Sequence, residues 1–500
     1  RKEDQAFQEG GLRFELSSNG SKDHLQGTIE GPENSFLEGS PPMALPFEIT
    51  LDRSANRAHL AIDGDTVDLE PMVLSDWVKL TFKAVAGMKV TGICRMMLTE
   101  MDDFVSLYVS PINIEPEKPV MPISHPSYYC SYLEKKLGTY ATLGLAEDTW
   151  ALNERVIDEK AFYEQAMLIC DERERMFKDA LEKTKKGLVT TVFDTTDRVQ
   201  HMFYRYLDPS HPANRDKDTE VHKDAIARVY EHMDRLLGEV FELTEDPDTL
   251  LMVISDHGFT NFRRGVNLNS WLKQKGYLHL KDGAETSGDW FEAVDWSRTR
   301  AFSLGLTGMF INRSGRERSG IVNEGEEYET LKNELIAGLK ELEDPETGRR
   351  AILDVFASND FFDGPYRFDA PDLLIGYDGG YRNGWDCATG AVTSEVFSDN
   401  TKSWSGDHCV DPRVVPGVFF CNRAINSETP NLVDIAPSVM RILGKEPPPY
   451  MHGQRIFAEP GEPATVRGML DPAVLNQSGA APGALVSPTE SEPVTARKAV

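Results

Sequence analysis

Three short segments, far apart in the chain, each carry an aspartate beside a histidine at a spacing that suits metal ligation. Asp197 and His201 are four residues apart, Asp256 directly precedes His257, and His408 follows an aspartate in the segment 404–408. Mixed carboxylate and imidazole ligands suit zinc or manganese, whereas calcium prefers cages of oxygen alone. Two such ions about 3.5–4 Å apart can hold the attacking and leaving oxygens of a phosphoryl transfer. The residues by themselves therefore favour a dinuclear metal hydrolase.

The elements that must position these residues are strands of a mainly parallel sheet. Continuous aliphatic or β-branched runs are typical of strands covered on both faces, and five such runs are found at 188–193, 250–254, 308–312, 372–376 and 417–421. Sites in open parallel sheets lie beyond the carboxyl ends of the strands, so we expect the three segments to meet at one rim. A helix that starts after residue 193 would place Asp197 and His201 on one face. Asp194 would then either cap that helix or orient a ligand, and Gly258 permits the chain to bend beside His257.

Amphipathic helices alternate with these strands. Apolar residues recur at helical spacing over 160–183 and 218–241, and a further helix is predicted at 434–443. This alternation indicates an α/β fold with a doubly wound, mainly parallel sheet.

The first part of the chain differs, because it alternates apolar and polar residues with a period of two. Residues 47–51, 58–62 and 78–82 show this pattern with intervening turn residues, which indicates an antiparallel sheet with one wet face. We therefore expect a β-rich insert domain, a small sandwich or barrel, at 1–111. An α/β metallohydrolase domain follows at 112–458, and a Pro-, Ala- and Gly-rich tail at 459–500 is predicted to be disordered.

Composition narrows the class of protein. The chain has 500 residues, 40% of them hydrophobic, which excludes a wholly disordered protein, and its formal net charge of −28 makes polymeric nucleic acid an unfavourable partner. The six scattered cysteines make no disulfide framework or zinc ribbon, and no apolar run is long enough to span a membrane. These features predict a soluble cytoplasmic protein without a membrane partner, although the chain starts at Arg1 and an export signal upstream stays open.

The ordered motifs also resemble a known family. Asp-x-x-x-His, Ser-Asp-His-Gly, Gly-x-His, the helix segment Asp-Ile-Ala-Pro-Ser and Met451-His-Gly453 are together similar to the alkaline phosphatase superfamily. Within it the chain looks closest to the type I phosphodiesterase/nucleotide pyrophosphatase branch and to bacterial proteins described as predicted phosphohydrolases or phosphomutases. The resemblance covers about 112–458.

The resemblance implies two divalent metal ions, zinc first and manganese as the other choice. One ion would take Asp197, His201 and His408. The other would take Asp256 and His257, together with an aspartate and a nucleophilic Thr or Ser that the family places in an N-terminal strand and helix. No strand and helix of this kind, with an aspartate and a nucleophile, precede Asp197. We therefore expect the nucleophile to lie upstream of residue 1, and we assign no catalytic residue in this chain.

These observations predict a phosphohydrolase or phosphodiesterase that cleaves a small phosphorylated substrate, a nucleotide or another phosphate ester. Two alternatives stay open: a phosphomutase of the same fold, and a non-catalytic binding module stabilised by metal. Arg263 and Arg264 either reach a substrate phosphate or belong to a solvated loop. Asn267 and Asn269 are interpreted as helix caps. The oligomeric state stays open.

Overall fold

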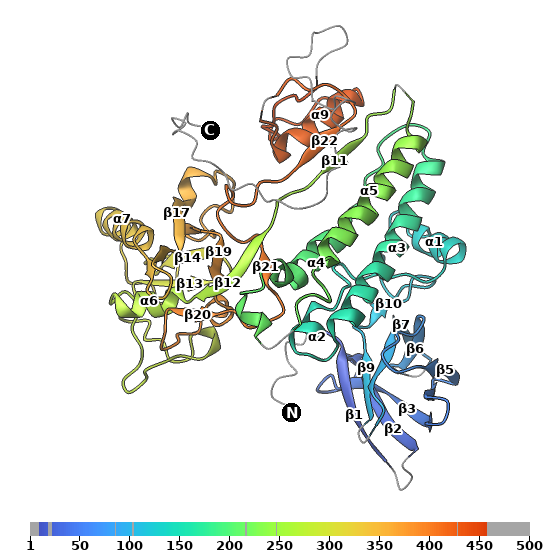
Figure 1. The fold of residues 1–500 in the computed structure, drawn as a ribbon. Coiled ribbons are helices and arrows are strands. Elements are labelled where there is room, and N and C mark those ends of the chain that lie inside the picture. The colour runs from blue at the N-terminus through green and yellow to red at the C-terminus, as the bar shows by residue number, and fades with distance from the viewer. Residues whose placement is uncertain are drawn as a thin grey trace. The chain divides into compact units, whose positions relative to one another are not determined.

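The computed structural model describes residues 10–18, 23–85, 87–102, 105–215, 218–246, 248–427 and 429–457. The tail predicted at 459–500 lies outside the described residues. The chain forms two compact units, one of residues 1–246 with 255–418 and one of 247–254 with 419–500 (Figure 1). All five predicted metal ligands belong to the first unit.

The N-terminal part of the first unit is an antiparallel β structure, as its period-two pattern predicts. One sheet has seven strands in the order β5-β4-β3-β2-β1-β9-β8, and a second has three in the order β10-β7-β6. The strands are β1 (Leu12–Ser18), β2 (His24–Glu33), β3 (Pro42–Asp52), β4 (Arg57–Ile62), β5 (Asp65–Leu69), β6 (Val78–Lys83), β7 (Lys89–Cys94), β8 (Met96–Glu100), β9 (Val105–Val109) and β10 (Asn113–Ile114). Along β3 every second side chain is buried, and Ile49, Leu60 and Leu80 from three strands share one core. Whether 1–111 forms a separate domain stays a prediction.

A group of helices follows: α1 (Tyr129–Leu137), α2 (Thr149–Asn153), α3 (Glu159–Lys183), α4 (Thr195–Phe203) and α5 (Ala225–Leu243). The helix predicted at 160–183 is confirmed as α3, and the one predicted at 218–241 begins later, at Ala225. Asp158 caps α3 by accepting a hydrogen bond from the Ala161 amide. The helices α3, α4 and α5 pack against one another and bury Phe162, Val199 and Val229 (Figure 1).

The remainder of the first unit contains small sheets covered by helices. One sheet joins β19 (Gly380–Asn383), β12 (Thr260–Val266) and β20 (Phe397–Asp399), and β21 (Gly406–Asp407) also pairs with β12. Another has the order β13-β14-β18-β17. Its strands are β13 (Ala301–Leu304), β14 (Gly308–Ile311), β18 (Leu373–Tyr377) and β17 (Ile352–Ala357). A short hairpin pairs β15 (Glu343–Asp344) with β16 (Arg349–Arg350). The helices here are α6 (Leu268–Gln274), α7 (Glu326–Lys340) and α8 (Trp385–Ala388).

The mixed α/β class is therefore right, but the described residues do not show the mainly parallel, doubly wound sheet that we predicted. Among the pairs of described strands only β12 and β19 run parallel. The run 188–193 forms no strand, and its residues Leu188 and Val192 are 56% and 73% exposed. The runs at 308–312 and 372–376 do form strands, but they pair antiparallel with their neighbours. A continuous apolar run cannot specify the direction of the partner strand, which explains the error in the sheet, and the exposure of 188–193 shows that such a run need not be a buried strand.

The second unit contains β11 (Met252–Ile254) paired antiparallel with β22 (Phe419–Cys421). It also contains α9 (Ile435–Ile442), which confirms the helix predicted at 434–443. Gly444 follows this helix with a φ of 68°, a backbone conformation that glycine adopts readily at a helix end.

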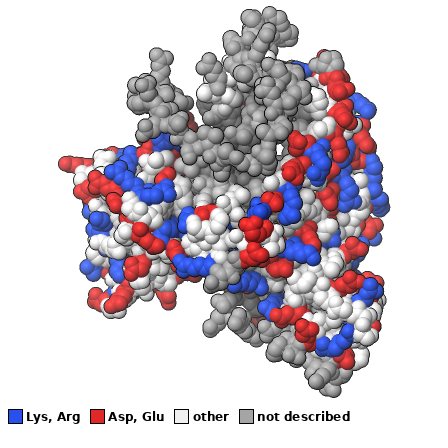
Figure 2. Space-filling view, viewed as in Figure 1, with Lys and Arg blue, Asp and Glu red and all other residues white. Residues whose placement is uncertain are grey.

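Two predictions from composition can be compared with the described residues. No helix in them is both long and apolar enough to cross a bilayer. All six cysteines are free thiols. Figure 2 shows Lys and Arg interspersed with Asp and Glu over the face in view, without one continuous basic area among the coloured residues.

Candidate metal centre

Helix α4 presents the first two predicted ligands on one face. Asp197 and His201 are one turn apart, and His201 Nε2 lies 3.4 Å from Asp197 Oδ2. Asp194 occupies the N-cap position, but its side chain makes no capping bond and instead contacts Arg173 at 2.8 Å. The predicted helix is therefore confirmed, and Asp194 ties its start to α3.

His201 is held in one orientation from two sides. Its side chain is buried, and its Nδ1 lies 2.7 Å from the carbonyl oxygen of Gly406. Because a carbonyl only accepts, Nδ1 donates this hydrogen bond, which leaves Nε2 directed at Asp197. The ring also packs on Trp404, with centroids 3.8 Å apart. A carbonyl that fixes the tautomer in this way is a common support of metal-bound histidine.

The turn after β11 brings Asp256 and His257 to the same place. His257 Nε2 lies 3.5 Å from Asp256 Oδ2 and 4.0 Å from Asp197 Oδ2, and its Nδ1 lies 3.0 Å from the carbonyl oxygen of Gly258. A Cβ at Gly258 would stand 2.7 Å from the carbonyl oxygen of Pro416. Glycine is thus required here by lack of space, and not by the bend that the sequence predicts, since the φ of Gly258 lies outside the left-handed region.

The third predicted segment contributes His408, directly after β21. Its Nε2 lies 3.6 Å from Asp197 Oδ2, and its ring stacks on that of His257 with centroids 3.5 Å apart and planes at 12°. Burial, together with the neighbouring rings of His257 and His201, lowers the pKa of His408 to about 4. The ring is therefore neutral near pH 7 and has a lone pair to offer.

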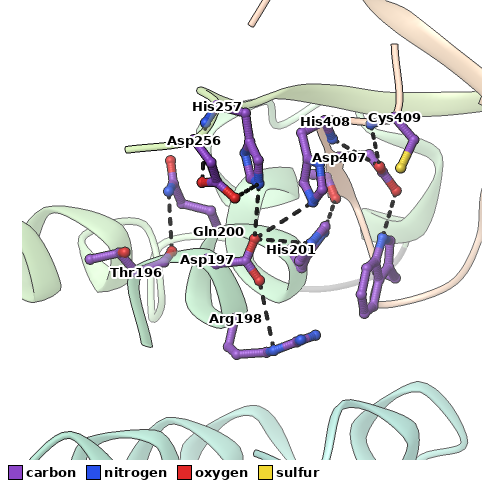
Figure 3. Close-up of polar contacts among 12 residues, drawn as sticks. Thr196, Asp197, Arg198, Gln200, His201, Asp256, His257, Asp407, His408 and Cys409 are labelled. Atoms are coloured by element: carbon purple, nitrogen blue, oxygen red, sulfur yellow. Dashed lines mark hydrogen bonds and ion pairs between the residues drawn. The ribbon is translucent and has the colours of Figure 1, made fainter. Parts of the chain in front are cut away.

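One carboxylate oxygen is the meeting point of the site. The Nε2 atoms of all three histidines face Asp197 Oδ2, from a helix, a turn and a strand end (Figure 3). Burial opposes ionisation of Asp197, but His201, Arg198 and His408 outweigh it and lower the pKa of this carboxyl. Asp197 is thus an anion surrounded by imidazole nitrogens.

This donor set fits a divalent metal ion. Ligand atoms of Asp197, His257 and His408 all lie within 4.8 Å of one another. Tetrahedral zinc with bonds of about 2.0–2.1 Å separates its ligand atoms by roughly 3.3 Å. The distances of 3.4 and 3.6 Å from Asp197 Oδ2 to His201 and His408 are close to that separation. The three predicted segments therefore converge, but the group within 4.8 Å takes His257 from the second predicted ion and does not include His201 or Asp256.

Sequence reasoning missed four residues that support the site. Asp407 accepts hydrogen bonds from the backbone amides of His408 and Cys409, from Trp404 and from Arg382. Phe259 lies with its ring centroid 4.8–5.5 Å from the centroids of all three histidine rings. Asp407 and Phe259 adjoin recognised histidine motifs, which is a usable signal. Trp404 is indicated only by its position in the segment 404–408. Arg382 lies 25 residues before Asp407, and no pattern in its neighbouring sequence indicates it.

The arginines that follow His257 are occupied elsewhere. Arg263 forms an ion pair with Asp208, and Arg264 is buried against Asp344 and Asp399. Neither guanidinium is free to meet a phosphate in this arrangement. Asn267 caps α6 by accepting a hydrogen bond from the amide of Ser270, as predicted.

Three other polar side chains, Asn269, Thr195 and Thr196, also have structural partners. Asn269 does not cap α6: its side chain exchanges hydrogen bonds with the backbone of Ser303. The hydroxyls of Thr195 and Thr196, next to Asp197, donate to Glu147 and to the carbonyl oxygen of Phe193.

Comparison with known proteins agrees with the motifs. A search of the curated proteins finds no significant match. The family model described as type I phosphodiesterase / nucleotide pyrophosphatase matches residues 77–390, more than half of the chain, and this span includes Asp197, His201, Asp256 and His257 but not His408. This family lies in the alkaline phosphatase superfamily, acts hydrolytically on small phosphate esters or nucleotides, and generally uses divalent metals. The chain belongs to the type I phosphodiesterase/nucleotide pyrophosphatase family.

Proposed function

We propose that this protein is a dinuclear-metal phosphodiesterase or phosphohydrolase that acts on a small phosphorylated substrate such as a nucleotide. The observation that carries the proposal is the convergence of three imidazole Nε2 atoms on Asp197 Oδ2 in a member of this family. Carboxylate and imidazole ligands favour zinc, with manganese as the second choice.

The two ions would divide the five residues between them. Asp197, His201 and His408 would hold one, and Asp256 with His257 would contribute to the other. Bound ions would supply Lewis-acid charge that stabilises the attacking and leaving oxygens at phosphorus.

The chain's own residues prepare this chemistry. The carbonyls of Gly406 and Gly258 keep the Nε2 atoms of His201 and His257 directed inward. Phe259 packs an apolar ring among the imidazoles, which shields one side of the site from water. With Arg263 and Arg264 paired to carboxylates, the bound ions would supply positive charge that a phosphate meets.

The first test measures metal content per chain by elemental analysis after dialysis. We expect bound zinc or manganese in the parent chain and a marked loss in His201→Ala. His211→Ala is the matched control, because His211 is equally buried but bonds only to backbone groups away from the site. No bound metal in the parent chain, or equal loss in the control, would contradict the proposal.

The second test measures hydrolysis of bis-para-nitrophenyl phosphate by the metal-loaded chain. Because no catalytic nucleophile is assigned in this chain, we expect low turnover, and a substantial metal-dependent rate that disappears in His257→Ala would contradict that expectation. Release of free phosphate from a monoester would separate a hydrolase from a phosphomutase, which passes the phosphoryl group to a sugar. Metal binding without any turnover would leave the metal-stabilised binding module as the better description.

A further inference from the structure

A buried charge network lies behind the histidines and is not explained by ligation itself. Arg382 on β19 is 1% exposed, and its guanidinium carbon lies 4.6 Å from the ring centroid of Phe262 and 4.2 Å from that of Trp385. Its Nη1 donates to Asp407 Oδ2 at 2.6 Å, and Asp407 is 2% exposed. Arg382 is thus a fully buried cation directed at one carboxylate.

Asp407 uses both of its oxygens to fix the strand end that carries His408. Oδ1 accepts the amides of His408 and Cys409 at 2.8 and 2.9 Å. Oδ2 accepts the indole N–H of Trp404 at 2.8 Å besides Arg382. With all of these bonds made, Asp407 is a support and not a ligand, although it lies beside His408 and Cys409 in a ligand-like group.

The same carboxylate also reaches the other side of the site through Trp404. The Trp404 ring packs on His201, and the Gly406 carbonyl next to Asp407 accepts the hydrogen bond from His201 Nδ1. Asp407 therefore sets the backbone direction of His408 and the packing of His201 at once. Its own position depends on the cation of Arg382.

Stability alone does not account for this pair. A buried ion pair contributes little net free energy relative to apolar groups of the same shape. Arg382 Nη2 is in addition buried without a hydrogen-bond partner among the described residues. Because burying Arg382 in this way costs free energy, we expect the residue to have another role, which is to position its neighbours.

We propose that Arg382 is a positioning residue of the metal centre, which holds His408 and His201 in ligating orientation through Asp407 and Trp404. The inference rests on the proposed function, since it concerns affinity for the ion. Arg382 touches neither ion nor substrate, so its effect appears in metal affinity before it appears in chemistry.

The experiment compares binding of Mn²⁺ alone to the full chain, from the free Mn²⁺ signal in electron paramagnetic resonance titrations. Arg382→Met keeps an apolar side chain between Phe262 and Trp385 but removes the charge. We expect its Mn²⁺ affinity to fall by about 10–100-fold, the effect typical of residues that orient ligands. Arg382→Lys restores a cation, and we expect it to recover part of that affinity.

Arg264→Met is the matched control. Arg264 is also a buried arginine paired with a buried aspartate, Asp344, but its partners do not touch the histidines. We expect it to lower the melting temperature as Arg382→Met does and to bind Mn²⁺ with parent affinity. If Arg382→Met fails to fold, Arg382→Gln decides, because it removes the charge and keeps a side-chain donor for Asp407.

The outcomes separate this inference from the proposed function. If the parent chain binds no Mn²⁺, the proposed function fails, and the inference fails with it. Parent affinity in Arg382→Met, or in Arg382→Gln where that variant decides, overturns the inference alone. An equal loss in Arg264→Met also overturns it, because the effect would then be general destabilisation.

Discussion

The two halves of the candidate metal centre are held in different ways. In the helix half (Asp197, His201 and His408), the amide of Ser405 donates to the carbonyl oxygen of His201 at 2.7 Å, and Asp407 fixes the next turn of chain. In the turn half (Asp256 and His257), the Asp256 side chain is 71% exposed and pairs with the neighbouring His257.

The difference shows that similar Asp-His motifs do not imply similar preorganisation. In the helix half the ligands are ordered before an ion arrives, so binding costs little side-chain entropy. In the turn half an ion must order Asp256 itself, which makes binding weaker. We therefore expect the helix half to fill first.

The largest expected effect follows from removing the charge that anchors the helix half. Asp407→Asn leaves Arg382 buried without its carboxylate, which costs about 3–5 kcal/mol in comparable buried pairs. Urea unfolding of the metal-free chain measures this change. Asp256→Asn makes the same chemical change in the exposed half and should alter the unfolding free energy by no more than about 0.5 kcal/mol. Equal effects in both variants would show that the halves are anchored alike.

Metal affinity should separate the halves next. Asp197→Asn removes the anion that three imidazoles face, so we expect zinc affinity to fall by more than the roughly 100-fold upper effect of supporting residues. Competition with a chelating dye measures it. Asp256→Asn should weaken binding by about tenfold or less, because a solvent-exposed carboxylate is already well hydrated. The reverse order would identify the turn half as the primary site.

The tight packing of the helix half gives a third prediction. A Cβ at Gly406 would stand 2.6 Å from the carbonyl oxygen of Gln200 and 2.7 Å from the Tyr204 Cβ. Gly406→Ala must push the 404–408 segment away from α4, and overpacking of this kind costs about 1–3 kcal/mol. We expect lower stability together with weaker metal binding. Gly364→Ala, at an open position, is the control that should change neither property.

The smallest effect is a dependence of stability on pH. Burial alone would raise the pKa of Asp407, but Arg382, His201 and the hydrogen bonds from Cys409 and Trp404 lower it well below its usual range. Its stabilising contribution is present above the unfolded-state pKa of about 3.9 and is lost as pH falls through the lower folded-state pKa. Below about pH 4, stability should therefore fall more steeply in the parent chain than in Asp407→Asn. Denaturant titrations across that range test this, and parallel curves would contradict it.

Local patterns predicted the parts of the fold that depend on near neighbours in sequence. The alternation at 47–51 and 58–62 appears as β3 and β4, and the spacing of Asp197 and His201 appears as one face of α4. Such spacing follows from the geometry of a strand or a helix wherever the segment lies. Continuous apolar runs do not specify which strands pair or in which direction. The predictions of a strand at 188–193 and of a mainly parallel sheet rested on such runs, and the described residues show neither.

The sequence by itself contains the three Asp-His segments, and their residue types are the basis for predicting a divalent ion. Only the tertiary structure shows that the histidines face one oxygen of Asp197, that the Asp256 side chain is exposed, and that Arg382 pairs with Asp407. The physical reason is distance along the chain. Segments separated by 25 to more than 200 residues, such as Arg382 and Asp407 or His201 and Gly406, meet through the packing of the whole unit, which no local period encodes.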